Sequence, residues 1–165
     1  MNEPIKTPWI QTDLVTLIER GRILHDISGA TPNEVLASIV YNPQLPGPVN
    51  RNELLQAVLE RETLMPTSIG KGIALPHPRN PIITDIQEQF VSIAFPEHPV
   101  DWKALDNKPV HTVLLIVSAS AKLHLHTLSW INFFCQQEGF RELLERRTSQ
   151  EELTTFIQHV EAAWT

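Results

Sequence analysis

The most informative stretch of the chain is Thr67-Ser68-Ile69-Gly70-Lys71-Gly72-Ile73-Ala74-Leu75-Pro76-His77-Pro78-Arg79. The glycines predict a flexible loop, and the apolar run at 73–75 predicts a short buried strand. Pro76 and Pro78 restrict the backbone on both sides of His77 and remove two amide donors. The pattern predicts a fixed imidazole at the end of a strand, where functional side chains often lie in α/β folds. A turn histidine without a chemical role is the alternative interpretation.

The composition is typical of one globular domain. The chain has 165 residues, of which 42% are hydrophobic and 19% charged, which is enough for a proper core. The net charge is −6 and the basic residues are scattered, so a nucleic-acid partner is not expected. Cys135 is the single cysteine and cannot form an intrachain disulfide, which fits a reducing cytoplasm. No apolar leader or membrane-length apolar run is visible, so we expect a cytoplasmic protein without direct membrane insertion.

The order of the predicted elements favours an α/β fold. Amphipathic spacing and N-cap residues predict helices, and short apolar or alternating runs predict strands. The expected helices cover residues 9–20, 31–40, 50–61, 122–137, 140–146 and 149–163. The expected strands cover residues 23–27, 73–75, 90–95 and 110–117. We therefore expect a flexible N-terminal arm over residues 1–9 and one domain over residues 10–163, with a sheet between helices.

Several helix boundaries rest on particular residues. Thr31 can cap a helix, Pro32 suits the first helical position and Glu34 completes a capping box. Arg61 is expected to be the last residue of the helix over 50–61. Gly139 is expected to break the helix over 122–137.

Two histidines stand close together in Leu123-His124-Leu125-His126. On a helix, residues two apart point about 200° from each other, so these two rings cannot share one metal ion. The helical wheel places His124 near the middle of the apolar arc and His126 on the opposite pole. We therefore expect His124 to face the sheet and His126 to face solvent. A core histidine without chemistry is the alternative interpretation of His124.

Arg61 is a third candidate functional residue. Taken alone, it is explained as a solvated cation that complements the helix dipole. Taken with His77 and His124, it completes a set suited to phosphoryl transfer. A neutral histidine nitrogen can attack phosphorus, and Arg and His donors can stabilise the charge on the transferring group. The N-terminal amides of the His124 helix could add an anion site.

These residues carry a resemblance to a known family. The chain resembles the enzyme IIA component of the phosphoenolpyruvate-dependent phosphotransferase system, of the fructose–mannitol type that includes the nitrogen-regulatory branch. The resemblance covers residues 10–163. It rests on Leu59-Glu60-Arg61-Glu62, on Thr67, on Ile69-Gly70-Lys71-Gly72-Ile73-Ala74-Leu75-Pro76-His77, and on His124-Leu125 at the start of a helix.

The resemblance implies a fold and a set of site residues. The implied fold is a mixed β-sheet sandwiched by helices on both faces. His77 would be the phosphorylated histidine, His124 the second active-site histidine and Arg61 the phosphate-binding arginine. The residues expected to bind phosphate or support the loop are Thr67, Gly70, Gly72 and Arg79, and the role of Arg79 is open. His111 stands where the family often has an acidic residue, and no chemistry is assigned to it.

Two possible functions share one phosphoryl relay and differ in the protein on which the phosphorylated chain acts. The first is a phosphohistidine relay that accepts its phosphoryl group from a histidine phosphocarrier (HPr-like) and acts on a regulatory target. The sequence around His124 and the lack of an attached domain favour this nitrogen-branch output. The second is the same relay feeding a IIB domain of a sugar permease. Neither needs a cofactor or a metal.

A third possible function, metal-dependent hydrolysis through His77, His124 and His111, has less support in the sequence. The sequence has no carboxylate or thiolate at ligand spacing around these histidines. The glycine loop is also not a Walker-type nucleotide loop, because it lacks the upstream glycine and the Ser or Thr after the lysine.

Overall fold

The computed structural model describes residues 13–47 and 49–163. The helices are α1 (Leu14–Gly21), α2 (Pro32–Val40), α3 (Arg51–Leu64), α4 (Ala121–Cys135), α5 (Glu138–Glu145) and α6 (Gln150–Ala162), with a 3₁₀ turn η1 (Ile86–Glu88). The strands are β1 (Ile23–Ile27), β2 (Ser68–Gly70), β3 (Ile73–Ala74), β4 (Phe90–Pro96) and β5 (Thr112–Val117). The expected arm over residues 1–9 lies outside the described residues.

The strands form one mixed sheet in the order β1-β4-β5-β3-β2. β1 pairs parallel with β4, β4 antiparallel with β5, β5 parallel with β3, and β3 antiparallel with β2. The long central strands β4 and β5 are buried along their whole length, as expected of strands covered on both faces. The predicted mixed α/β sheet is confirmed.

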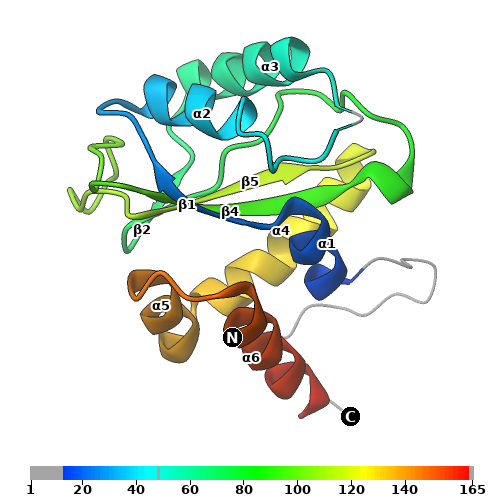
Figure 1. Cartoon of the computed structure of the whole chain (residues 1–165), viewed down its shortest axis with the longest axis vertical. Coiled ribbons are helices and arrows are strands. Elements are labelled where there is room, and N and C mark those ends of the chain that lie inside the picture. Colours follow the sequence, from blue (N-terminus) through cyan, green and yellow to red (C-terminus); the bar gives the residue numbers. More distant parts are fainter. Residues whose placement is uncertain (1–12, 48, 164–165) are drawn as a thin grey trace.

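Helices cover both faces of this sheet and give it two cores (Figure 1). On one face, α2 and α3 pack on side chains such as Leu24, Ala94 and Leu115. On the other face, α1, α4, α5 and α6 pack on the alternate side chains, such as Ile93, Leu114 and Ile116. This alternation follows from the two-residue period of a strand. No helix among the described residues is long and apolar enough to cross a bilayer.

The helix starts follow the cap residues in the sequence. The side chains of Thr31, Asn50, Ser120 and Ser149 each accept a hydrogen bond from the amide three residues on. Each bond satisfies one of the orphan amides of a first helical turn. Glu34 reaches back to the amide of Ala30, at 2.8 Å, rather than to the amide of Thr31 that a capping box predicts.

Two predicted helix ends are wrong. α3 continues past Arg61 to Leu64, and it stops there because Pro66 favours the extended backbone that Met65 adopts. α4 ends at Cys135, and Gly139 lies inside α5 rather than between helices. A side chain on Gly139 would come within 2.9 Å of the ring of Phe156, so this glycine serves the contact between α5 and α6.

The glycine segment forms a strand pair rather than the predicted loop followed by one strand. β2 pairs antiparallel with β3 through the turn at Gly70, Lys71 and Gly72. β5 begins at Thr112, two residues later than predicted, because Val110 forms an isolated bridge with Val100. The carbonyl of Gly72 accepts from the amides of both His111 and Thr112, which joins the turn to the start of β5.

Candidate functional site

His77 lies three residues after the C-terminal end of β3, and backbone hydrogen bonds fix the segment around it. The amide of Leu75 donates to the carbonyl of Thr67 at 3.0 Å, and the carbonyl of Pro76 accepts from the amide of Ile116 at 3.0 Å. After the histidine, the amide of Arg79 donates to the carbonyl of Ala57 in α3 at 3.1 Å. The segment is therefore fixed to β5 on one side and to α3 on the other.

The hydrogen bond of the His77 ring fixes which of its two nitrogens carries the hydrogen. Nδ1 lies 2.9 Å from the carbonyl oxygen of Leu75. Because a carbonyl can only accept, Nδ1 carries the hydrogen and Nε2 keeps its lone pair. Burial lowers the pKa of His77, although the bond to Leu75 and the charge of Glu62 oppose this shift. A lowered pKa keeps the ring neutral at pH 7, which is the state a nucleophile needs.

His124 lies against His77. The two ring centroids are 4.4 Å apart, and the ring planes are inclined by 38°. His124 belongs to the first turn of α4, and its amide donates to the carbonyl of the cap residue Ser120 at 3.0 Å. Burial, His77 and the charge of Arg61 together lower the pKa of His124 to about 4. Both imidazoles are therefore neutral together at pH 7.

Arg61 reaches the same place from the last turn of α3. One of its Nη1 hydrogens is donated to the carbonyl of Met65 at 2.8 Å, so the guanidinium caps its own helix. The side chain is half-buried, and its charge lowers the pKa of both His77 and His124. The interpretation of Arg61 as a helix-end cation and its interpretation as a site residue are thus compatible.

These side chains line a cavity of about 280 Å³. Arg61, His77, Arg79 and His124 contribute to its wall. The rest of the lining comes from the loop after His77, the end of β5 and the start of α4 (Pro78, Asn80, Pro81, Ile116, Ser118, Ser120, Ala121 and Leu125). The positive end of the α4 dipole faces this space and favours a bound anion. A phosphoryl group held here would meet neutral nitrogen donors and the guanidinium groups of Arg61 and Arg79.

The other predicted site residues, Thr67, Gly70 and Gly72, do not line this cavity. Thr67 is buried and donates both its amide and its hydroxyl to the carboxylate of Glu62. Gly70 and Gly72 lie in the turn at the far end of β3 from His77. These three residues therefore lie away from the cavity, and loop support stays a prediction for them.

Glu62 is a residue of this region that sequence reasoning left without a role. It lies at the end of α3, and its carboxylate holds Thr67, whose carbonyl in turn holds Leu75. Its only sequence signal is its place beside Arg61. The five-residue step from Glu62 to Thr67 belongs to no helix or strand period, so the contact depends on how the chain turns at Pro66.

Comparison with known proteins identifies the family. The family model for "Phosphoenolpyruvate-dependent sugar phosphotransferase system, EIIA 2" matches residues 16–160. The chain belongs to this family. The resemblance seen in the sequence is thereby confirmed, and the chain is a phosphotransferase-system protein of the EIIA type.

EIIA relatives of two kinds resemble the chain. It is 28% identical to the nitrogen regulatory protein of Pseudomonas aeruginosa, over 90% of this chain and 96% of that protein. It is also 28% identical to the fructose-specific EIIABC component of Bacillus subtilis, over 88% of this chain. The match spans only 23% of the Bacillus protein.

Solved EIIA structures share the fold. The nitrogen regulatory protein IIA-Ntr of Neisseria meningitidis superposes with a TM-score of 0.66 at 23% identity, covering 81% of this chain and 90% of that one. The Escherichia coli complex of mannitol enzyme IIA with phosphorylated enzyme IIB gives a TM-score of 0.60 at 22% identity, over 81% of this chain and 93% of that one. These likenesses establish the architecture of this EIIA chain.

His126, predicted to face solvent, is half-buried. Its ring packs edge-on against the ring of Trp130, with the two ring centroids 4.5 Å apart. Its Nε2 is buried without a hydrogen-bond partner among the described residues. The same helical wheel puts Phe133 beside His126 on the outer pole and Leu125 in the apolar arc, but Phe133 is buried and Leu125 is 65% exposed. The wheel fails because α4 is covered by the sheet on one side and by α5 on another, so its buried face is wider than one stripe.

The three histidines of the metal hypothesis do not share a site. His77 and His124 line one cavity, whereas His111 lies beside Gly72 at the other end of β3. In the part of the chain that the structure describes, no group of three or more His, Cys, Asp or Glu side chains is arranged to hold a metal ion.

Proposed function

We propose that His77 accepts a phosphoryl group on Nε2 from a histidine phosphocarrier of the HPr type and passes it on. The observation that carries this proposal is the pair of neutral imidazoles, 4.4 Å apart, beside Arg61 in one cavity. The bond from Nδ1 to the carbonyl of Leu75 leaves Nε2 of His77 as the nucleophile.

The transfer exchanges one phosphorus–nitrogen bond for another. The Nε2 lone pair of His77 attacks phosphorus, and the bond between phosphorus and the donor histidine breaks with its electron pair returning to that ring. The phosphorylated ring keeps the proton on Nδ1 and so gains positive charge. The carbonyl of Leu75, which accepts that proton's hydrogen bond, is placed to stabilise it.

The other residues of the cavity act on the transferring group. Three equatorial oxygens share its negative charge in the transition state. The guanidinium of Arg61 supports that charge directly, and His124 supplies a neutral donor with its ring hydrogen. Neutral His124 adds no positive charge that would compete with Arg61 or lower the nucleophilicity of His77. We assign Arg79, exposed at the rim, a secondary role in attracting the donor protein.

The proposed output is regulatory. It is supported by the coverage of nearly the whole nitrogen regulatory protein, 96% of its length, by this chain. The alternative output is transfer to a IIB domain of a fructose–mannitol type system, and the similarity to the Bacillus fructose component supports it. Because phosphoenolpyruvate and phosphocarriers are cytoplasmic, either output places the protein in the cytoplasm, in keeping with its free, buried Cys135.

The test is phosphorylation of the purified chain. With phosphoenolpyruvate, the general phosphotransferase enzyme I and the phosphocarrier, the wild type should gain one phosphoryl group that is labile in acid and stable in base. His77→Ala should gain none. His98→Ala, which removes an exposed histidine outside the cavity, should be labelled like the wild type. Labelling of His77→Ala at the wild-type level would disprove the assignment.

Adding a IIB domain to the phosphorylated chain separates the two outputs. Rapid loss of the label to IIB would favour the transport role. Retention of the label, with a change in binding to a regulatory target, would favour the nitrogen-branch role.

A further inference from the structure

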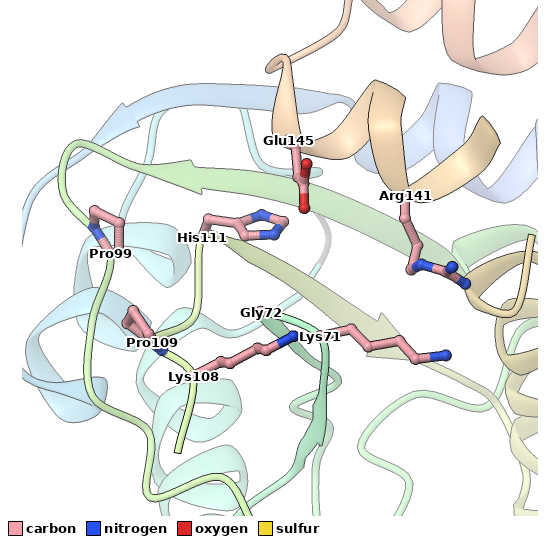
Figure 2. A pocket seen from close by; sticks show the side chains of 8 residues that line it. All are labelled: Lys71, Gly72, Pro99, Lys108, Pro109, His111, Arg141 and Glu145. Atoms are coloured by element: carbon pink, nitrogen blue, oxygen red, sulfur yellow. The ribbon is translucent and has the colours of Figure 1, made fainter. Parts of the chain in front are cut away.

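A second hollow, with a volume of about 430 Å³, lies at the opposite end of β3 from His77. Its wall is assembled from three separated parts of the chain. The β2–β3 turn brings Lys71, the segment before β5 brings Lys108 and His111, and α5 brings Arg141 and Glu145 (Figure 2). Three cationic side chains therefore surround one space, in a protein whose net charge is −6.

Asp106 holds the two lysine-bearing segments together. Its Oδ2 accepts from the amide of Lys71 at 2.7 Å, and its Oδ1 accepts from the amide of Lys108 at 3.1 Å. One carboxylate thus bonds the backbone at two positions, Lys71 and Lys108, which lie 37 residues apart in the sequence. The backbone at both lysines is held beside the hollow, so less backbone ordering entropy is lost when an anion binds.

The cationic groups of the hollow outnumber the carboxylates beside them, which are Asp106 and Glu145. Among the described residues, no carboxylate lies within ion-pair distance of the ammonium of Lys71 or Lys108. Arg141 donates one Nη1 hydrogen to the carbonyl of Cys135 at 3.0 Å, which anchors the guanidinium and leaves its other hydrogens for a ligand. Glu145 is the one carboxylate of the wall, so the formal charge of the wall is positive.

The remaining polar groups suit a hydroxylated body rather than a second anion. Glu145 points toward the ring of His111 in Figure 2. Nδ1 of His111 lies 2.7 Å from the hydroxyl of Thr112, and its Nε2 is buried against Gly72, so Glu145 supplies the acceptor on this side of the hollow. A carboxylate accepts from hydroxyl groups and repels a second negative charge.

We propose that this hollow binds a small phosphomonoester whose phosphate meets Lys71, Lys108 and Arg141. The hydroxylated body of the ligand lies toward Glu145 and His111. Two lysines and one arginine match the charge and the oxygens of a phosphate dianion. The volume fits a metabolite of hexose phosphate size. The site is separate from the phosphohistidine cavity, and the inference does not depend on the proposed relay.

Amide NMR of the full-length chain, titrated with glucose 6-phosphate, inorganic phosphate and glucose, tests the proposal. Glucose 6-phosphate should saturate with a Kd of about 1 mM or below and move the amides of Lys71, Lys108 and Arg141. Inorganic phosphate should bind more weakly, and glucose should not bind. If shifts occur only around His77 and His124, the anion belongs to the relay cavity and the proposal is wrong. If inorganic phosphate binds as tightly as glucose 6-phosphate, the hydroxylated body contributes nothing and the phosphomonoester assignment fails.

Substitutions in the hollow give the matched comparison. Lys71→Gln and Lys108→Gln should each weaken glucose 6-phosphate binding about tenfold, because each removes one charge-assisted contact. Lys103→Gln, which removes an exposed lysine from the same loop without touching the hollow, should change binding less than about twofold. If Lys103→Gln and Lys108→Gln weaken glucose 6-phosphate binding equally, the effect comes from the overall charge and the proposed site is wrong.

Asp106→Ala distinguishes a binding site whose lysines are positioned by Asp106 from general electrostatic attraction to a positive surface. It makes the region more positive, so simple attraction predicts tighter binding. It also frees the segments of Lys71 and Lys108, so the proposed site predicts weaker binding. All four variants should still accept phosphate on His77, and that readout keeps failure of this proposal distinct from failure of the relay.

Discussion

Glu62 accepts two hydrogen bonds from Thr67, one from its amide at 2.7 Å and one from its hydroxyl at 2.6 Å. The carbonyl of Thr67 then receives the amide of Leu75, and the carbonyl of Leu75 receives Nδ1 of His77. An unbroken series of hydrogen bonds thus leads from the end of α3 to the proposed nucleophile. Glu62 is therefore a positioning residue for His77, and it acts through two intermediates.

Glu62→Gln should lower both stability and transfer rate. The amide side chain can accept only one of the two hydrogen bonds, and a bond to a charged acceptor contributes about 1.5–3 kcal/mol. Urea unfolding and the phosphorylation rate of the same variant measure the two effects. Glu60→Gln, an exposed neighbour on α3, is the control and should change neither. A destabilised Glu62→Gln variant with the wild-type rate would make Glu62 structural only.

Arg61→Lys should keep the fold and slow phosphoryl transfer. Lysine retains the charge, but it cannot bond to the carbonyl of Met65 and hold phosphate oxygens in one planar fork. Loss of one preorganised donor predicts a rate about 10-fold lower or more. Stopped-flow phosphorylation gives the rate and circular dichroism gives the thermal midpoint. Arg79→Lys, at the exposed rim, should have the smaller effect, and an unchanged rate in Arg61→Lys would remove Arg61 from the site.

Substitution of the two histidines of α4 should have different effects, one on the rate of phosphoryl transfer and the other on the stability of the fold. His124→Ala removes the donor beside His77 and should slow transfer about 10-fold or more. His126→Ala removes the edge-on contact with Trp130 and should cost about 0.5–1.5 kcal/mol of stability without slowing transfer. Chemical unfolding and phosphorylation of both variants check this. A slow His126→Ala variant would mean that α4 moves when that contact is lost.

Stability should fall as the medium is acidified, in part through His124. Its pKa is about 4 in the folded chain, mainly because of burial, against an ordinary value of 6.5. Between these values the unfolded chain binds more protons than the folded one, so stability rises with pH there. The contribution is fully present above pH 6.5 and is lost as the pH falls toward 4.

The measurement is urea unfolding of the wild type and His124→Gln at several pH values in that window. The stability difference between the two proteins should shift in favour of the variant as the pH falls. A difference that is constant with pH would mean that His124 does not titrate abnormally.

Gly72→Ala should destabilise the chain far more than Gly47→Ala. At Gly72, φ is +79° and an added Cβ would lie 2.3 Å from the ring of His111. The strained backbone alone costs about 1–3 kcal/mol. At Gly47 an added Cβ would meet nothing within 4 Å. Thermal unfolding compares them, and Gly72→Ala/His111→Ala should recover part of the loss. No recovery would assign the cost to backbone strain alone.

Local signals in the sequence were enough for most elements of the fold. The cap residues Thr31, Asn50 and Ser149 placed helix starts, because a side chain that bonds an amide three residues away needs no distant partner. The apolar runs at 90–95 and 110–117 predicted the central strands β4 and β5. Boundaries that depend on packing were missed, such as Gly139, whose role is to admit the ring of Phe156 from another helix.

The sequence alone was enough to predict the family, the mixed sheet between helices, and the candidates His77, His124 and Arg61. Which residues share a cavity became visible only in the folded chain. It separates Gly70 and Gly72 from His77 because β3 runs between them, and it half-buries His126 because the ring of that residue packs against Trp130. It also joins Lys71 to Lys108 through Asp106. Periodicity and caps are local properties of the chain, whereas a cavity depends on contacts between distant segments that no local pattern records.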